Sequence, residues 1–455
     1  MASSTSLTLA PTAGQVCTTV QVSGSGFGDK ETVAVTFDAT RIATTQATKS
    51  GMLFTSFMVP QTSQPGNHTV TATGKSSGRS ASATFHVVRP TTTFWSQFGS
   101  TAAGGRANSA DSTINPRNVA QLTWDWSATL TGGGGIPGVA VSGDTVYAED
   151  GAGIYALGAA CGKLKWFSST MGRGATVSSY ISPAVANGMV YAGGGDNRIY
   201  AFDAQTGATR WTFNPQVEML SSPTVANGMV YSTDRGGNVY ALDGRSGAVR
   251  WSFHAVGDSI GQTPAVANGT VYFNTIGGIA YALDARTGTQ RWQSAVGSSS
   301  EGVTVPAVDN GVLFVTASAA PTRGAVVALN ATTGARKWIA YTPFYGTNGL
   351  AVANGMIYVS TISHGVSAFD EATGALKWQV SVAMGDSAPA VANGVVYVGA
   401  GTADLYAFDA TTGAKLATFG DCGTEPDSSP VVANGVVYIG CGSILGALHL
   451  PGTNP

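Results

Sequence analysis

SPAVANGMVYAGGGDNRIYAFDAQTGATRW, residues 182–211, decides the fold, because edited copies of it fill most of the remaining chain. Its pattern predicts strands at 183–186, 189–191 and 198–203 and the start of a fourth at 209–211. Asn187-Gly188 suits the two positive φ angles of a tight hairpin turn, and Gly207 suits a second turn. Four antiparallel strands joined by three turns make one blade of a β-propeller.

The unit recurs with a period near forty residues, which is typical of a repeat architecture. The copies begin at residues 137, 183, 223, 264, 306, 350, 389 and 430. Their tryptophans recur at a fixed place, which favours core packing over a platform for stacking sugars: Trp126, Trp166, Trp211, Trp251, Trp292, Trp338 and Trp378. The copy that begins at residue 389 has Ala417 where Trp is expected.

The last copy stops after its third strand, near residue 450, whereas Trp126 has no first three strands of its own. We therefore expect Leu122 to Trp126 to close the ring by completing the last blade. Closure would remove the exposed sheet edges that invite aggregation.

The chain is expected to be all-β, with an eight-bladed β-propeller at residues 90–455 and its closing strand near 120–127. Residues 1–89 alternate six or seven short strands with Gly-, Ser- and Pro-rich turns, which favours a β-sandwich. The stretch from Val20 to Phe27 and the strand ending at Val88 resemble the immunoglobulin-like domains of bacterial surface proteins. Residues 94–118 are expected to be irregular, with one helical turn within 114–119.

The composition has few charges: 11% of the 455 residues are charged and the net charge is −2, against about 25% charged residues in ordinary soluble domains. This balance argues against a general attraction to nucleic acid or anionic membranes. No apolar run is long enough to predict a transmembrane segment. The chain starts without a visible signal peptide, yet its abundant Thr, Ser and Gly favour a secreted or cell-surface protein.

The four cysteines have no spacing typical of a metal site. Cys422 precedes the last blade and Cys441 ends the second strand of that blade. Both are expected at the same rim, and the sequence permits a disulfide between them. We expect Cys17 and Cys161 to be small residues with free thiols.

Two features resemble the family of pyrroloquinoline-quinone-like propellers. One is the repeat A-x-D-x-x-T-G-x-x-x-W, complete from Ala201 to Trp211, and the other is the segment from Ile114 to Leu122 that leads to Trp126. The resemblance covers residues 94–450 and implies that the Trp and the Thr-Gly turn dock adjacent blades. Some members of this family are dehydrogenases that bind the quinone and a calcium ion on the propeller axis and oxidise alcohols or sugars. Others keep the propeller and bind proteins or glycans.

The chain departs from the dehydrogenases. It has no adjacent Cys-Cys pair, no haem-attaching C-x-x-C-H and none of the long insertions that build their active site. Their calcium ligands and catalytic Asp match no motif here, so no catalytic residue is assigned.

Loops between the fourth strand of one blade and the first strand of the next usually form the binding face of a propeller. Five of these loops hold one carboxylate each: Glu218, Asp258, Glu301, Asp386 and Asp427. Converging carboxylates can hold calcium through oxygen ligands or receive a basic or sugar ligand. The alternative is that the loops are polar because they are solvated.

Three hypotheses for function follow. The first is a non-enzymatic binding or scaffold protein that needs no cofactor and takes a protein or glycan ligand on one face, with self-assembly permitted by the low charge. The second is a dehydrogenase that uses pyrroloquinoline quinone and calcium, and a weaker third is a carbohydrate-active enzyme. An axial cavity lined by acids and an aromatic platform would favour the enzymes, whereas a narrow axis plugged by small residues would favour the binding protein.

Overall fold

A computed structural model describes residues 4–88, 93–132, 135–170, 181–194, 196–215, 217, 221–255, 260, 263–297, 305–320, 323–342, 347–361, 365–382, 387–401, 404–420 and 428–451. The chain divides into two compact units, one within residues 1–92 and one at residues 93–451.

The first unit is a β-sandwich of two sheets. In the described residues, one sheet has the order β1-β3-β6 and the other the order β2-β8-β7-β4-β5. Their inward side chains, such as Val20, Val33 and Phe85, are fully buried in a shared core. The strands are β1 (Ser6–Ala10), β2 (Ala13–Gly14), β3 (Thr19–Ser25), β4 (Thr32–Phe37), β5 (Thr40–Gln46), β6 (Leu53–Met58), β7 (Gly66–Gly74) and β8 (Ser80–Val87).

The second unit is built of antiparallel sheets that follow one another along the chain. Among its described residues, seven sheets have four strands and one has five. Six of the sheets take four consecutive strands: β11 (Val139–Ser142), β12 (Thr145–Asp150), β13 (Gly153–Gly158) and β14 (Leu164–Ser169); β15 (Ala184–Ala186), β16 (Met189–Gly193), β17 (Ile199–Asp203) and β18 (Thr209–Phe213); β19 (Thr224–Ala226), β20 (Met229–Thr233), β21 (Asn238–Asp243) and β22 (Val249–His254); β23 (Ala265–Ala267), β24 (Thr270–Asn274), β25 (Ile279–Asp284) and β26 (Gln290–Ala295); β27 (Ala307–Asp309), β28 (Val312–Ala320), β29 (Arg323–Asn330) and β30 (Arg336–Tyr341); β31 (Thr347–Ala353), β32 (Met356–Thr361), β33 (Gly365–Asp370) and β34 (Leu376–Val380).

The two remaining sheets draw strands from the start of the unit. The five-stranded sheet adds β9 (Ala107–Asn108), in parallel, to β35 (Ala390–Ala392), β36 (Val395–Ala400), β37 (Asp404–Asp409) and β38 (Lys415–Phe419). The last sheet contains β39 (Val431–Ala433), β40 (Val436–Cys441), β41 (Ile444–His449) and β10 (Thr123–Thr129). Strand β10 runs antiparallel to β41 and places Trp126 opposite Ala447.

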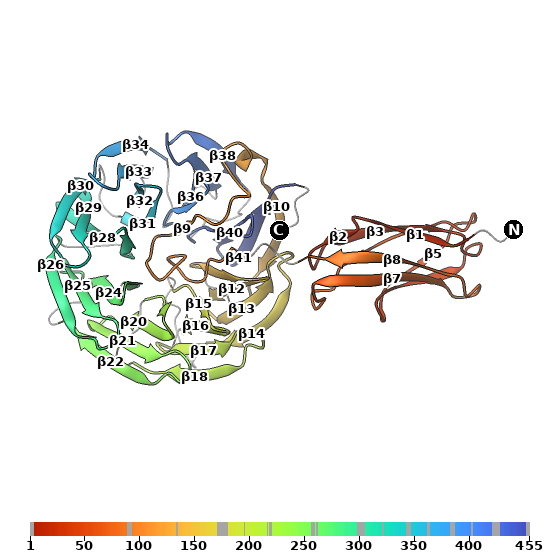
Figure 1. Cartoon of the computed structure of the whole chain (residues 1–455), viewed down its shortest axis with the longest axis horizontal. Helices are drawn as coiled ribbons and strands as arrows, with labels where there is room; N and C mark the ends of the chain where they lie inside the picture. Colours follow the sequence, from red (N-terminus) through yellow and green to blue (C-terminus); the bar gives the residue numbers. More distant parts are fainter. Residues whose placement is uncertain are drawn as a thin grey trace. The chain divides into compact units, whose positions relative to one another are not determined.

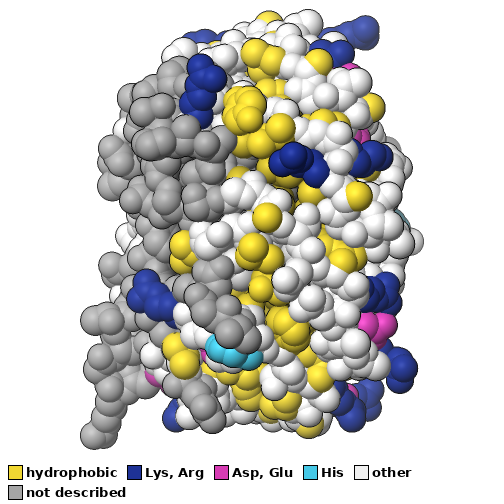
Figure 2. Space-filling view, turned by 90° about the vertical axis from the view of Figure 1, so that its left-hand side faces the viewer, with side chains coloured by type: hydrophobic (Ala, Val, Ile, Leu, Met, Phe, Trp, Pro, Cys, Tyr) yellow, Lys and Arg dark blue, Asp and Glu magenta, His cyan; other side chains and the backbone are white. Residues whose placement is uncertain are grey.

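The sheets follow one another around a ring in Figure 1, and contacts between their first strands close the circle. Contacts run from β11 through β15, β19, β23, β27, β31 and β35 to β39, and β39 contacts β11 again. The second unit is therefore a β-propeller. Figure 2 faces its outer edge on the side where Figure 1 places β26 and β30, and the few charged side chains there are scattered among hydrophobic and uncharged polar atoms.

The expected hairpin turns are confirmed. Asn187 and Gly188 have φ angles of 52° and 74°, and the Asn-Gly turns of the later sheets share this left-handed geometry. Asparagine tolerates positive φ and glycine adopts it without steric cost, so the pair suits a type I′ turn.

Except after the sheet with Ala417 in place of Trp, adjacent sheets dock through one tryptophan and one glycine. The indole N–H of Trp211 donates to the carbonyl of Gly244 at 2.9 Å, and a Cβ added to Gly247 would lie 2.7 Å from the Trp211 ring. The same contact joins Trp126 to Gly162, Trp166 to Gly207, Trp251 to Gly288, Trp292 to Gly334, Trp338 to Gly374 and Trp378 to Gly413. The glycine therefore serves both the turn and the packing of the neighbouring indole.

Three further observations complete the fold. The helical turn expected within 114–119 lies further along, as the 3₁₀ helix η1 (Val119–Gln121).

Cys17, Cys161 and Cys441 are disulfide-bonded. The expectation of free thiols at Cys17 and Cys161 is therefore wrong, because sequence does not reveal which cysteines meet in space. Cys422 lies outside the described residues, which leaves its pairing with Cys441 a prediction. No helix among the described residues is long and apolar enough to cross a membrane.

Candidate functional site

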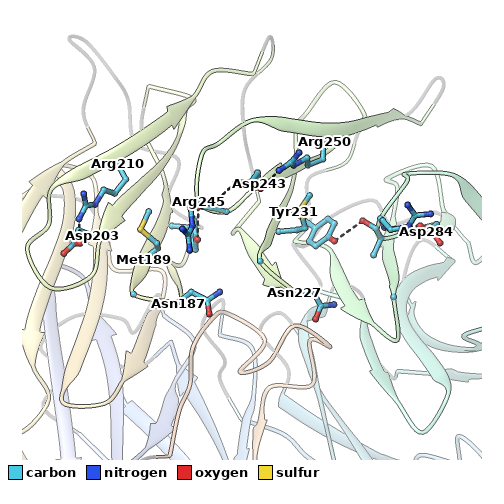
Figure 3. A pocket seen from close by; sticks show the side chains of 18 of the residues that line it. Asn187, Met189, Asp203, Arg210, Asn227, Tyr231, Asp243, Arg245, Arg250 and Asp284 are labelled. Carbon is cyan, nitrogen blue, oxygen red and sulfur yellow. Dashed lines mark hydrogen bonds and ion pairs between the residues drawn. The ribbon is translucent and has the colours of Figure 1, made fainter.

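A groove of about 1500 Å³ runs across three consecutive sheets, β15–β18, β19–β22 and β23–β26. It lies at the end of the sheets that carries the Asn-Gly hairpins and the Thr-Gly turns. Its lining comprises Asn187, Gly188, Met189, Tyr191, Asp203, Arg210, Asn227, Gly228, Met229, Tyr231, Asp243, Gly244, Arg245, Arg250, Gly269, Asp284, Ala285, Arg286 and Arg291. We call this the hairpin-face groove (Figure 3).

An aspartate and an arginine pair in the same way on each of these sheets. Arg210 lies 2.6 Å from Asp203, Arg250 lies 2.6 Å from Asp243, and Arg291 lies 2.8 Å from Asp284. The Asp ends the third strand and the Arg lies on the fourth strand, next to the docking Trp. The repeat therefore places a row of ion pairs along the groove. Figure 3 labels both residues of the Asp203–Arg210 and Asp243–Arg250 pairs.

Each aspartate is already saturated with hydrogen bonds. Oδ1 of Asp203 accepts from the backbone N–H groups of Gln205 and Thr206 and from the Thr206 hydroxyl, while Oδ2 accepts from Arg210. These bonds, that of Arg210 first, lower the pKa of Asp203 to about 2. Such a carboxylate is a poor general base near neutral pH, so the row acts as structure rather than as catalyst.

Two arginines of the groove have no such partner. Arg245 and Arg286 occupy the same place in consecutive turns, two residues after the aspartate, and both are exposed. In the described part of the chain neither guanidinium makes a hydrogen bond or an ion pair. With three arginines balanced by three aspartates, these two give the groove its excess positive charge.

The binding face expected from the sequence is a different one. Glu218, Asp258, Glu301, Asp386 and Asp427 all lie outside the described residues. The described fourth strands end, and the described first strands begin, at the opposite end of the sheets from the hairpin-face groove. The sequence signal for the groove was Arg in the third position of the motifs Asp243-Gly-Arg245 and Asp284-Ala-Arg286, where other copies have Gln, Thr or Ala.

A segment from the start of the second unit lies against the inside of the propeller. Residues 95–108, which we call the axial segment, run inside the circle of first strands. Main-chain carbonyls of the segment accept hydrogen bonds from Val185, Val266, Val308, Val352 and Val391, one in each of five first strands. Trp95 bridges β11, Gln97 bonds β19 and Asn108 bonds β39.

Arg106 anchors this segment. It is 1% exposed, and its three guanidinium nitrogens donate to the carbonyls of Pro389, Phe98 and Pro430 at 2.7–2.9 Å. The guanidinium also lies 5.4 Å from the ring centre of Trp95 and 4.6 Å from that of Phe98. Burial lowers the pKa of Arg106 to about 9, which still leaves it charged near neutral pH.

In the dehydrogenases that the repeat resembles, a quinone and a calcium ion lie on this axis. Calcium takes several oxygen ligands, often carboxylates, yet no group of three or more His, Cys, Asp or Glu in the described ranges could hold a metal. The donors of Arg106 are used by main-chain carbonyls, and the guanidinium covers Trp95 and Phe98. The described residues of the axis therefore do not fit this cofactor pair.

Comparisons with known proteins place both units. A family model described as outer membrane protein assembly factor BamB, built on pyrroloquinoline-quinone-like repeats, matches residues 94–252, 235–344 and 322–450. A macroglobulin-like domain model matches residues 2–87, which fits the expected immunoglobulin-like domain. No curated protein matches the sequence.

Similar solved structures come from two functional classes. BamB from Moraxella catarrhalis is 19% identical with a TM-score of 0.60, over 73% of this chain and 99% of that one. A quinohemoprotein alcohol dehydrogenase from Comamonas testosteroni is 16% identical with a TM-score of 0.66, over 80% and 81%. A europium-containing methanol dehydrogenase is 16% identical with a TM-score of 0.64, over 76% and 89%. These identities show a shared fold, and the family match shows that this chain belongs to the BamB family of pyrroloquinoline-quinone-like propellers.

Proposed function

We propose that this protein is a non-enzymatic binding or scaffold protein that holds a protein partner in the hairpin-face groove. The observation that carries the proposal is the groove itself, about 1500 Å³ across three sheets and lined by arginine, asparagine, methionine and saturated aspartate side chains. Sites for small molecules and cofactors are about 300–1000 Å³ and mostly apolar. A larger, polar and open groove suits a macromolecule better.

The axis supports the same proposal. A dehydrogenase of this fold would need a cofactor on the axis, whereas here residues 95–108 lie against the first strands and the Arg106 guanidinium is bonded to main-chain carbonyls. The sequence lacks the motifs that hold calcium in the dehydrogenases. No group of three or more His, Cys, Asp or Glu among the described residues could take their place. We therefore propose that the protein needs neither the quinone nor calcium.

Two finer features belong to this proposal. The closed circle from β11 to β39 and back supports a complete ring of eight blades.

Disulfide bonds at Cys17, Cys161 and Cys441 support a location outside the cytosol, because structural disulfides persist in oxidising compartments.

Photo-crosslinking tests the proposal. A photoreactive phenylalanine analogue replaces Met229, which lines the groove, or Met356, which holds the same strand position in β32 but is not a lining residue. Both methionines are half-buried. In cells that make the full chain, we expect a discrete protein adduct from position 229 and none from 356. Equal adducts from both positions, or none from 229 and from Met189 tested likewise, would contradict the proposal.

A further inference from the structure

We propose that the hairpin-face groove recognises an extended, acidic protein segment, and that Arg245 and Arg286 select it. This inference rests on the proposed function and adds the chemistry of the partner. Its starting point is a departure from the repeat: these are the two arginines of the groove that no described carboxylate pairs.

The ion pairs of the groove explain why it should select a negatively charged partner. Asp243 and Asp284 accept the hydroxyl of Ser246 or Thr287 and a guanidinium, and these bonds hold the pKa of each carboxyl well below its usual range. Neither aspartate is therefore open to a cation. Among the described residues of the groove, the charges without a partner are the guanidinium groups of Arg245 and Arg286, one on each of two neighbouring sheets.

The shape of the groove favours a chain over a single ion. It extends across three sheets, and Arg245 and Arg286 sit on turns of consecutive sheets. Guanidinium groups bind carboxylates through two parallel hydrogen bonds. A segment with acidic residues spaced along it can reach both turns, and the amides of Asn187 and Asn227 on the lining can bond its main chain.

Nucleic acid fits the groove less well. Single-stranded nucleic acid is bound by many cations together with exposed aromatic rings on which bases stack. The groove has two uncompensated arginines, and its tyrosines are buried: Tyr191 and Tyr231 are 2% and 1% exposed. Their hydroxyls donate to the carbonyls of Gly244 and Ala285, so they offer neither a stacking face nor a free donor.

The test is peptide selection with the full chain. Phage that display random dodecapeptides are selected on wild-type protein and on the double variant R245Q/R286Q. The control is R336Q/K337Q, which removes two exposed cations that do not line the groove. Far-UV circular dichroism and melting curves check that all three proteins fold alike.

We expect wild type and control to enrich peptides rich in Asp and Glu and the R245Q/R286Q variant to lose that enrichment. Selected peptides, synthesised with a fluorescent label, should bind R245Q/R286Q at least about fivefold more weakly, because two charge interactions are removed. Analogues of these peptides with Asn for Asp and Gln for Glu should bind wild type as weakly as the acidic peptides bind R245Q/R286Q. Added salt should reduce the difference in affinity between wild type and R245Q/R286Q.

Four results would overturn the inference: no enriched peptides on wild type, enrichment of neutral or basic peptides, acidic peptides that bind R245Q/R286Q equally, or stronger Arg-dependent binding of a dodecathymidine oligonucleotide. Photo-crosslinking at Met229 separates this failure from that of the proposed function. An adduct at Met229 without acidic selection would leave the binding protein standing and remove only the acidic partner.

Discussion

Alanine at Gly334 is expected to destabilise the propeller much more than alanine at Gly311. Both glycines lie in the sheet β27–β30 and have nearly identical φ angles of 74° and 75°. A Cβ at Gly311 would meet nothing within 4 Å, whereas a Cβ at Gly334 would lie 2.6 Å from the Trp292 ring. The pair therefore separates backbone strain from the packing of neighbouring sheets.

The magnitudes follow from these two terms. A left-handed conformation costs an alanine about 1–2 kcal/mol, and this applies to both variants. Overpacking adds about 1–3 kcal/mol at Gly334 alone, because Trp292 is 9% exposed and its indole N–H is bonded to the carbonyl of Ala331 at 3.0 Å. We expect about 1–2 kcal/mol for G311A and about 2–5 kcal/mol for G334A.

Guanidinium denaturation followed by tryptophan fluorescence measures the difference. All nine tryptophans lie at residue 95 or later, so the signal reports the propeller and not the first unit. The double variant G334A/W292F should recover part of the extra loss, since contacting residues are not additive. Equal losses for G311A and G334A would refute the reasoning that Gly334 is kept for the indole.

Three further predictions follow. Replacing Tyr231 with Phe should lower the free energy of unfolding by about 1 kcal/mol, because the Tyr231 hydroxyl donates to the carbonyl of Ala285 at 3.0 Å. Tyr397→Phe should be neutral or stabilising, because that buried hydroxyl has no partner among the described residues. Denaturation midpoints measure both variants, and an equal loss of stability in the two would contradict the prediction. Arg106→Met should cost about 3–5 kcal/mol, since it leaves three buried carbonyls without their donor; the melting temperature checks this, and an unchanged value would show that the axial segment needs no anchor. The backbone N–H of Gly28, with Ser76 and Ser77, lowers the pKa of the Glu31 carboxyl from 4.5 to about 2. Glu31 should therefore stabilise the first unit above pH 4.5 by at most about 3 kcal/mol, and this stability should be lost as the pH falls towards 2. Amide exchange of β3 against pH should show that loss in wild type and a flatter profile in Glu31→Gln, whereas parallel profiles would contradict the prediction.

The repeat could be predicted because its signals are local. Asn187-Gly188 and Gly207 encode turns through φ angles that few other residues adopt, and the structure has positive φ at all three. The closing strand was predictable for a topological reason: one copy lacked a fourth strand, and one tryptophan lacked three strands before it. Strand β10 now lies beside β41.

The axis and the groove were harder to predict for physical reasons. The axial segment has no periodicity, since each of its contacts is made to a different first strand far along the chain. The groove depends on Arg245 and Arg286, which look like ordinary turn residues until their sheets are placed side by side. The disulfides at Cys17 and Cys161 require proximity that spacing does not encode.

The central claim is that this propeller binds a protein partner without a redox cofactor. Calorimetric titration of the full chain with pyrroloquinoline quinone, with and without calcium, tests it most directly when a dye-reduction assay on alcohols and sugars follows. The account predicts no saturable heat and no dye reduction. Tight, calcium-dependent binding together with dye reduction would contradict it.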